Sequence, residues 1–246
     1  MSQSYNVKEI LDDKSQSWSI FDGQVSKAYD LVSDVISLGL YRRWCTGLAK
    51  EIPHDQSLQI LDLATGTGKI PLAIHKRAAP TKHQFVGVDL SQEMLQIFES
   101  KLKTHPLADS ITLKHGDATK LEEPEGQYDV VTMACGLRNV GDTSACLNEI
   151  FRVLKPGGKV YFLEPSFPRS SFLRSVFIGY FRYFVPLVAG LFSNGDAYRY
   201  FNKSVEQFPY GQALIQLIEE HGFVQSVQSQ RFAWGAGALY VAQKPN

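Results

Sequence analysis

From residue 58 onward, short apolar runs alternate with stretches whose apolar residues recur at helical spacing. The helical stretches are 70–77, 92–103 and 144–154. Strands that alternate with helices predict βαβ units and a parallel sheet. Because the runs are almost continuously apolar, we expect each strand to be buried on both faces of the sheet. The five expected strands are 58–63, 85–90, 111–115, 128–134 and 158–163.

The two ends of the chain follow a different pattern. Within residues 21–50 the apolar spacing predicts one or two helices. After residue 164 the alternation stops for about 45 residues, and residues 211–221 then predict a helix that ends at a glycine. The runs 223–230 and 236–242 predict two more strands, which we expect to add an antiparallel edge to the sheet.

Composition excludes several classes of protein. The 246 residues suffice for one domain with a sizeable core, and 44% of them are hydrophobic, which is ordinary for a globular chain. Basic and acidic residues number 25 each, so no surplus positive field favours nucleic acid as a partner. Three cysteines form no CxxC pair, which excludes a disulfide framework and fits a reducing compartment. Residues 1–20 read as a polar, loosely docked arm without a signal-peptide core, so we expect a cytoplasmic protein.

A glycine-rich segment, ILDLATGTGKI, joins the first expected strand to its helix. It is no phosphate-binding P-loop, because Ile70 stands where that motif needs serine or threonine. It is an incomplete dinucleotide fingerprint, because Pro71 stands at the third glycine position. A nucleoside without phosphates remains, and Asp62 before the loop suits a cationic sulfonium or ammonium group. The alternative is that Gly66 and Gly68 form only a structural turn.

Acidic residues follow the next two expected strands. Asp89 ends the second strand, where a carboxylate accepts both hydroxyls of a ribose in dinucleotide folds. Asp117 and Ala118 follow the third strand, where an adenine is expected. The alternatives are that Asp89 caps the helix after Ser91 and that Asp117 is only a turn residue. The ligand interpretation is preferred, because such folds place ligands at the carboxyl ends of parallel strands.

This order of motifs resembles the class I S-adenosylmethionine-dependent methyltransferases. The resemblance implies a Rossmann-like α/β fold, with a seven-stranded, mostly parallel sheet, helices on both faces and an antiparallel last strand. It implies S-adenosylmethionine as cofactor and S-adenosylhomocysteine as product. The implied cofactor site is Asp62, Ala64, Thr65, Gly66, Thr67, Gly68, Asp89, Leu90, Met94, Asp117, Ala118, Ala134 and Cys135.

Three further stretches resemble one family, the ubiquinone/menaquinone biosynthesis C-methyltransferases. They are RVLKPGGKVYFLEPS at 152–166, CGLRNV at 135–140 and YDLVSDVISLGLYRRW at 29–44. The segment 198–209 also resembles this family, so the similarity spans about residues 20–245. The resemblance implies C-methylation of a prenylated quinol, either a demethylmenaquinol or a ubiquinone precursor.

Some positions depart from the family pattern. Ser33 replaces the usual asparagine, Tyr41 replaces histidine, and Ala134 with Cys135 replaces Ser-Phe. These departures bear on the ring substrate more than on the cofactor. Two alternatives stay open: the same cofactor with another aromatic or lipid acceptor, by C- or O-methylation, or an inactive scaffold with a methyltransferase fold.

The family resemblance also implies catalytic residues. A quinol carbon becomes nucleophilic only when a neighbouring hydroxyl loses its proton, and Arg138, with Asn139 beside it, is implied to stabilise that phenolate. Tyr29, Asp30 and Tyr41 are candidates to cover the ring, and Glu164 is expected to face the site or to hold Arg138. The alternatives are a structural ion pair for Arg138, core packing for Tyr29 and a surface charge for Asp30. The histidines lack metal-ligand spacing, so we expect a mechanism without metal.

The stretch 172–192 is apolar and 21 residues long, but Arg174, Arg182 and Pro186 interrupt it. Two arginines within a single membrane span are costly, so a transmembrane helix is rejected. A lid over an oily substrate, or transient contact with the inner face of a membrane, is preferred to a dimer contact or an ordinary core helix. A homodimer or a quinone-biosynthesis complex stays open.

We expect one methyltransferase domain over residues 1–246. It divides into an N-terminal arm and helical cap at 1–50, a cofactor-binding half at 51–164, an apolar lid insert at 165–209, and a terminal helix and strand pair at 210–246.

Overall fold

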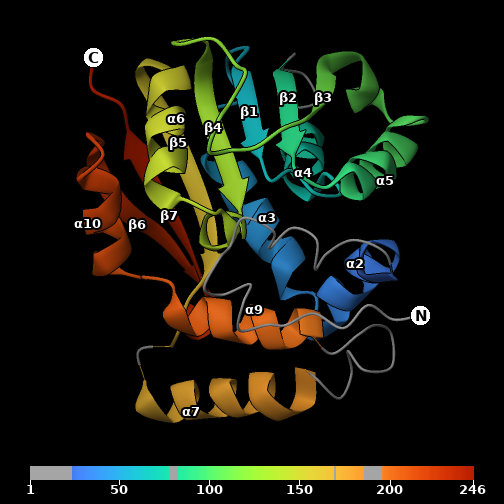
Figure 1. Ribbon diagram of the computed structural model, residues 1–246, viewed down its shortest axis with the longest axis vertical. Helices are drawn as coiled ribbons and strands as arrows, with labels where there is room; N and C mark the ends of the chain where they lie inside the picture. The colour runs from blue at the N-terminus through green and yellow to red at the C-terminus, as the bar shows by residue number, and fades with distance from the viewer. Residues whose placement is uncertain (1–23, 78–82, 169, 186–195) are drawn as a thin grey trace.

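The computed structural model describes residues 24–77, 83–168, 170–185 and 196–246 (Figure 1). Its centre is a seven-stranded sheet with the order β3-β2-β1-β4-β5-β7-β6. The strands β1 to β5 are parallel, and β7 runs antiparallel to both β5 and β6. The expected fold and the expected antiparallel edge are confirmed. The strands are β1 (Gln59–Leu63), β2 (Gln84–Asp89), β3 (Ile111–His115), β4 (Tyr128–Ala134), β5 (Leu154–Pro165), β6 (Val224–Phe232) and β7 (Gly237–Gln243).

The helices predicted from apolar spacing are also present. Residues 24–51 form two helices, and the arm expected at 1–20 lies outside the described residues. Two helices begin at side-chain caps, because Ser91 accepts from the amide of Met94 at 3.2 Å and Asp142 accepts from that of Ala145 at 3.0 Å. The helices found at the predicted positions are α2 (Gln24–Ile36), α3 (Leu40–Glu51), α4 (Lys69–Arg77), α5 (Gln92–Leu102), α6 (Thr143–Val153) and α10 (Gln212–Glu219).

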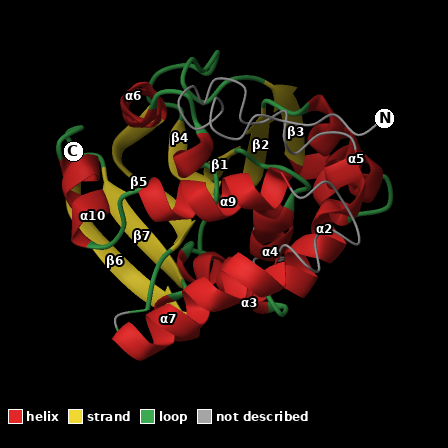
Figure 2. Cartoon of the chain, turned by 60° about the horizontal axis from the view of Figure 1, so that its bottom comes forward, coloured by secondary structure: helices red, strands yellow, loops and turns green. Residues whose placement is uncertain are grey.

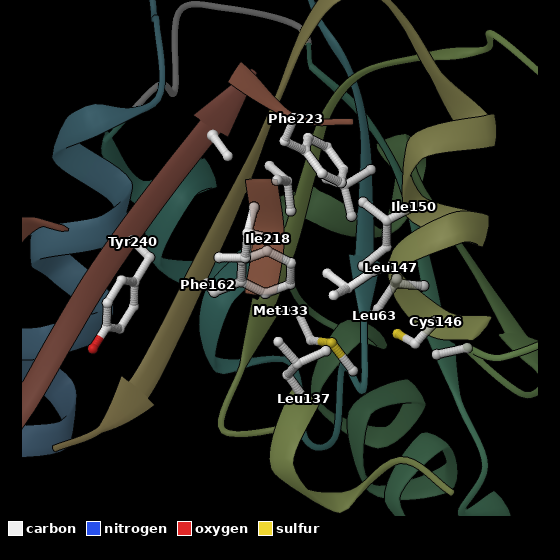
Figure 3. Packing of buried hydrophobic residues seen from close by; sticks show 14 of the residues in the cluster. Leu63, Met133, Leu137, Cys146, Leu147, Ile150, Phe162, Ile218, Phe223 and Tyr240 are labelled. Atoms are coloured by element: carbon white, nitrogen blue, oxygen red, sulfur yellow. The ribbon is translucent and has the colours of Figure 1, made fainter. Parts of the chain in front are cut away.

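Each face of the sheet buries its own hydrophobic cluster. Successive strand residues point to opposite faces, so Leu63 and Phe162 face one cluster while Ile60 and Tyr161 face the other. The first cluster packs against α6 and α10 (Figure 3). The second packs against α3, α4 and α5. The central strands are therefore buried on both faces, as their continuous apolar sequences predict.

The loop between β1 and α4 needs a glycine at position 68. Gly68 has φ of 83°, and a Cβ atom there would lie 2.1 Å from the ring of Phe98, which is fully buried. Glycine therefore allows both the left-handed backbone and the close packing of this loop on α5.

A layer of helices covers the carboxyl ends of the parallel strands. It contains α7 (Ser171–Gly179), the π-helical turn η4 (Tyr180–Phe184) and α9 (Asp196–Gln207). Figures 1 and 2 show α9 crossing this edge of the sheet, with α7 on its outer side. The sequence did not predict α9, and residues 169 and 186–195 of the insert expected at 165–209 lie outside the described residues. Among the described helices, none is long and apolar enough to cross a membrane.

Candidate functional site

A cavity of about 1010 Å³ lies at the carboxyl ends of the strands, beneath the helical layer. Its wall contains residues that follow four neighbouring strands, β1 to β4, as expected for a ligand site in a parallel sheet. Most residues of the expected cofactor site lie on this wall. They are Ala64, Gly66, Asp89, Leu90, Met94, Asp117, Ala118, Ala134 and Cys135.

Asp89 connects the ends of two strands. Its Oδ2 accepts a hydrogen bond from the amide of Gly66 at 2.7 Å, and its Oδ1 accepts from that of Ser91 at 2.8 Å. The cap of α5 is Ser91, so Asp89 is not the capping residue of that helix. Asp89 also lies on the cavity wall, at the strand end where such folds recognise ribose hydroxyls.

Asp117 forms a side-chain turn and also lies on the cavity wall. Its Oδ1 accepts from the amide of Thr119 at 2.8 Å, which is the side-chain turn that an aspartate often forms. Asp117 and the buried Ala118 also line the cavity. The turn is therefore compatible with a ligand next to Asp117.

Four residues of the expected cofactor site do not reach the wall: Asp62, Thr65, Thr67 and Gly68. Asp62 is only 1% exposed, and its Oδ1 accepts from the hydroxyl of Thr132 at 2.6 Å. Burial raises the pKa of Asp62 to about 7, although the hydrogen bond from Thr132 acts in the opposite direction. Asp62 therefore lies beneath the loop, and it titrates near neutral pH.

The backbone is left-handed where β1 and β4 end. Ala64 has φ of 51° and Cys135 has φ of 56°, values that cost non-glycine residues about 1–2 kcal/mol each. The two turns are close together, since a Cβ at Gly136 would lie 2.7 Å from the Cβ of Ala64. Such strain is common at functional sites, where the surrounding structure maintains it.

Arg138 lies on the turn after β4 and is buried with its partner. Its Nη1 lies 2.9 Å from Glu164 Oε2 on β5 and 2.6 Å from the carbonyl oxygen of Cys135. The other oxygen of Glu164 accepts from the amide of Leu137 at 2.9 Å. Burial alone would lower the pKa of Arg138, but the charge of Glu164, the neighbouring Cys135 and the hydrogen bond to Glu164 together raise it and keep the guanidinium charged. The structure therefore places an ion pair between two strand ends, with Arg138 on the cavity wall.

Asn139 completes this polar network and reveals a residue that the sequence did not indicate. Its Nδ2 donates to the carbonyl oxygen of Cys135 at 3.0 Å, and its Oδ1 accepts from the hydroxyl of Tyr200 at 3.2 Å. Tyr200 lies on α9 and is fully buried. The resemblance of 198–209 to the family was the only signal at this position, and it did not indicate a contact 61 residues away.

Replacing Tyr200 with phenylalanine is expected to lower kcat about fivefold and to change KM for the acceptor little. The reason is that one neutral hydrogen bond, which orients the Asn139 amide beside Arg138, contributes about 1 kcal/mol. Tyr161→Phe is the matched control, because its hydroxyl donates to the Glu51 carbonyl at 3.3 Å outside the cavity. An equal loss of kcat in both variants would contradict a role at the site.

Tyr29 lies on the cavity wall as a neutral hydrogen-bonding group. Burial, and then the neighbouring Cys135, raise the pKa of its hydroxyl above the ordinary value, while Arg138 acts in the opposite direction. The ammonium of Lys69 lies 5.9 Å from the ring centroid of Tyr29 and 5.1 Å from that of Tyr41. The pKa of Tyr41 is also raised, chiefly by burial, so at neutral pH both phenols remain protonated and neither serves as a base.

Asp30, the other catalytic candidate from α2, does not line the cavity. Its Oδ1 accepts from the hydroxyl of Thr67 at 2.7 Å, and its Oδ2 pairs with Lys101 of α5. The same Lys101 donates to the Thr67 carbonyl at 2.8 Å. Burial alone would raise the pKa of Asp30, but the hydrogen bonds from Lys101 and Thr67 lower it below its ordinary value. Asp30 therefore fastens α2 to the glycine loop and α5.

Replacing Asp30 with asparagine is expected to increase the dissociation rate of a bound nucleoside about fivefold. Asparagine still accepts from Thr67 but loses the charge that holds Lys101, and a loss of about 1 kcal/mol corresponds to that factor. Stopped-flow displacement measures this rate. Added salt should bring wild type toward the variant, because it screens the same ion pair.

The control for this experiment is Glu149→Gln. It removes an ion pair with Arg152, 2.7 Å long, on α6 away from the cavity. If the two variants release the nucleoside equally fast, α2 is not fastened by Asp30 in the way the contacts indicate.

The described part of the chain contains no group of three His, Cys, Asp or Glu side chains able to hold a metal ion.

Solved structures with this fold include proteins that are named methyltransferases. A protein of Methanococcus maripaludis, named a putative S-adenosyl-L-methionine-dependent methyltransferase, has a TM-score of 0.65 at 19% identity, covering 92% of this chain and 94% of its own. A methyltransferase of Thermotoga maritima, titled a possible histamine N-methyltransferase, has a TM-score of 0.62 at 18% identity, covering 92% and 99%. At this level of identity, these similarities show the fold alone.

Similarity in sequence identifies the family, which similarity in fold does not. The protein UbiE of Geobacter sulfurreducens, named a ubiquinone/menaquinone biosynthesis C-methyltransferase, is 34% identical over 89% of this chain and 85% of its own. The demethylmenaquinone methyltransferase of Symbiobacterium thermophilum is 34% identical over 92% and 91%. The model of the ubiE/COQ5 methyltransferase family matches residues 9–244. This chain is therefore a member of the ubiE/COQ5 methyltransferase family.

Proposed function

We propose that this enzyme, as one methyltransferase domain, transfers a methyl group from S-adenosylmethionine to a ring carbon of a prenylated quinol in respiratory quinone biosynthesis. The observation that carries the proposal is Arg138, held as a cation by Glu164 on the wall of a large, mainly apolar cavity. The names of relatives at 34% identity support the same acceptor class.

The residues on one side of the cavity fit the methyl donor. Asp89 offers carboxylate oxygens for vicinal hydroxyls, and Asp117 with Ala118 flanks the space for an adenine. Ala64 and Gly66 bring main chain to the wall at the end of β1. When bound, S-adenosylmethionine supplies an electrophilic methyl group on a sulfonium centre and leaves as S-adenosylhomocysteine.

The residues around Arg138 fit the acceptor. The guanidinium stabilises the negative charge of a quinol oxygen, which makes the neighbouring ring carbon nucleophilic. Arg138 keeps its own proton, so a water that Arg138 and Asn139 orient is assigned the removal of the quinol O–H proton. After methyl transfer, the same water moves the proton of the methylated ring carbon to the oxygen, which restores the aromatic hydroxyl. The phenol of Tyr29 donates a further hydrogen bond and covers the ring. Asp30 acts as a positioning residue through Thr67 and Lys101.

The opposite side of the cavity fits a prenyl tail. Ile36, Phe167, Val176 and Phe177 line it, and they come from α2, the end of β5 and α7. We also propose a cytoplasmic enzyme that contacts the inner face of the membrane transiently through 172–192, because the tail resides in the bilayer. A homodimer and a quinone-biosynthesis complex are separate possibilities that size measurements on the purified protein would distinguish.

Methyl transfer is the first experiment. Purified enzyme is incubated with labelled S-adenosylmethionine and chemically reduced demethylated quinones of the benzoquinol and naphthoquinol types, and the lipid extract is analysed by mass spectrometry. A labelled C-methyl product on one ring type is expected and identifies the substrate. An O-methyl product, or donor binding without product, would favour another acceptor. Absence of donor binding would favour an inactive scaffold.

A further inference from the structure

Exposed apolar side chains are concentrated around the cavity. Ten large hydrophobic side chains of the described residues are exposed, and seven of them belong to only three segments. These segments are the turn between α2 and α3, the α7–η4 helix, and the turn before β7. We call the seven residues the rim: Leu38, Phe172, Leu173, Val176, Tyr183, Phe184 and Trp234.

The rim is continuous with the mouth of the cavity. Leu38, Leu173, Val176 and Trp234 are exposed to solvent and also line the cavity wall. The hydroxyl of Tyr180 on η4 donates to the carbonyl of Ile36 at 2.9 Å, which joins two of the three segments. The rim is therefore one surface through which a long apolar group can leave the site.

Two rim residues are held in strained backbone conformations. Leu38 has φ of 51° and is 69% exposed, and Trp234 has φ of 57° and is 83% exposed. A left-handed backbone costs free energy. An apolar side chain that stays exposed to water contributes no burial free energy to offset that cost. Strain that persists without benefit to the fold indicates contact with something outside the molecule.

The segment that contains α7 and η4 carries charge of one sign. Residues 165–195 contain no aspartate or glutamate but three arginines, in a chain whose net charge is zero. Arg174 and Arg182, which flank the apolar side chains of α7 and η4, are both exposed. Apolar and aromatic side chains with flanking arginines are typical of segments that lie in the interface of an anionic membrane.

We propose that the rim docks on an anionic lipid bilayer and opens the cavity directly to the acyl-chain region. The acceptor then enters with its ring ahead and its tail still in lipid, without exposing the tail to water. This inference rests on the proposed function for its substrate. It extends the membrane contact beyond the α7 region to Leu38 and Trp234, and it predicts a preference for anionic lipid.

Vesicle sedimentation tests the surface. The full-length protein should bind vesicles of phosphatidylcholine with phosphatidylglycerol more tightly than vesicles of phosphatidylcholine alone. The double variant Phe172→Ser/Tyr183→Ser should weaken binding about tenfold, because it removes two exposed aromatic side chains. The matched control Val224→Ser/Val227→Ser changes exposed apolar residues of β6 away from the cavity and should bind like wild type. Equal binding by the two double variants would overturn the proposal.

Fluorescence tests the placement of Trp234. Vesicles with brominated acyl chains should quench wild type more than Trp234→Phe, although both proteins bind. Equal quenching would contradict insertion of Trp234. If Phe172→Ser/Tyr183→Ser instead converts a dimer into a monomer without changing vesicle binding, the rim is an interface between two copies.

Activity separates this inference from the proposed function. Phe172 and Tyr183 do not line the cavity, so their variant should methylate a water-soluble, short-tailed quinol at the wild-type rate. It should lose activity only toward a long-tailed acceptor in vesicles. If wild type fails on the soluble acceptor, the proposed function fails, while the vesicle measurements still decide whether the rim binds lipid.

Discussion

Replacing Arg138 with methionine is expected to lower kcat for quinol methylation about a thousandfold, the size of effect seen when a preorganised donor to a developing oxyanion is removed. Binding of S-adenosylmethionine should change less than about threefold, because Asp89, Asp117 and their strand ends remain in place. Single-turnover kinetics measures the first quantity and calorimetry the second.

This substitution has a structural cost that the experiment must separate from chemistry. Arg138 and Glu164 have side chains only 4% and 2% exposed, so methionine leaves a buried carboxylate without its partner. Breaking a buried pair costs about 3–5 kcal/mol of stability. The variant Arg138→Met/Glu164→Gln removes the charge as well, and glutamine still accepts from the Leu137 amide. It should recover stability but not kcat.

The variant Arg138→Lys provides the complementary comparison. Lysine keeps a positive charge but lacks the planar guanidinium, whose Nη1 donates to both Glu164 and the Cys135 carbonyl. An intermediate kcat is expected. If the double variant recovers kcat together with stability, Arg138 serves only the fold, and the structural alternative for this residue is correct.

Strand positions were predictable because each central strand is buried on both faces and is therefore continuously apolar. Helix positions were predictable from apolar residues at helical spacing, and the alternation of the two patterns indicates βαβ units. The helix α9 was not predictable in the same way. Its residues include aromatic, serine and asparagine side chains of modest helix propensity, and its burial at Tyr200 and Val205 depends on the strand ends beneath it. β5 also begins earlier than expected, because Leu154 pairs with Tyr128 before a bulge.

The sequence was enough to predict which strand ends form the candidate site. It was not enough to predict which residues of each loop line the cavity. Within the glycine loop, Ala64 and Gly66 line the cavity while Thr65 and Thr67 do not. A sequence motif does not specify which of its residues line the cavity. The partner of Thr67 lies 37 residues away on α2, at a distance along the chain that no local pattern encodes.

Replacing Asp62 with asparagine is expected to stabilise the ligand-free protein at pH 8 by about 2–4 kcal/mol. The pKa of Asp62 is raised from its ordinary 3.8 to about 7 in the folded protein. Between these values the folded state binds a proton that the unfolded state has lost. The free energy of unfolding therefore falls as the pH rises from about 4 to 7.

Asparagine has no proton to lose, and its carbonyl oxygen still accepts from Thr132, so the variant should lack this decline. Urea unfolding at pH 5 and pH 8 measures the difference. The stabilities of wild type and variant should converge at the lower pH and separate at the higher one. Equal stabilities at pH 8 would show that water entry or local movement removes the free-energy cost of the ionised Asp62 carboxylate.

Binding of the methyl donor should respond in the opposite sense, which distinguishes a ligand-binding Asp62 from a merely buried one. If the ionised carboxylate attracts the cationic donor, wild-type affinity increases as the pH passes 7, and Asp62→Asn loses that increase. Titration of the donor itself affects both proteins equally, so the difference between them isolates Asp62. A variant that is more stable and binds the donor equally well at pH 8 would make Asp62 a structural residue. A variant that is more stable but binds the donor weakly would show that an unfavourable buried charge is retained at this position for binding.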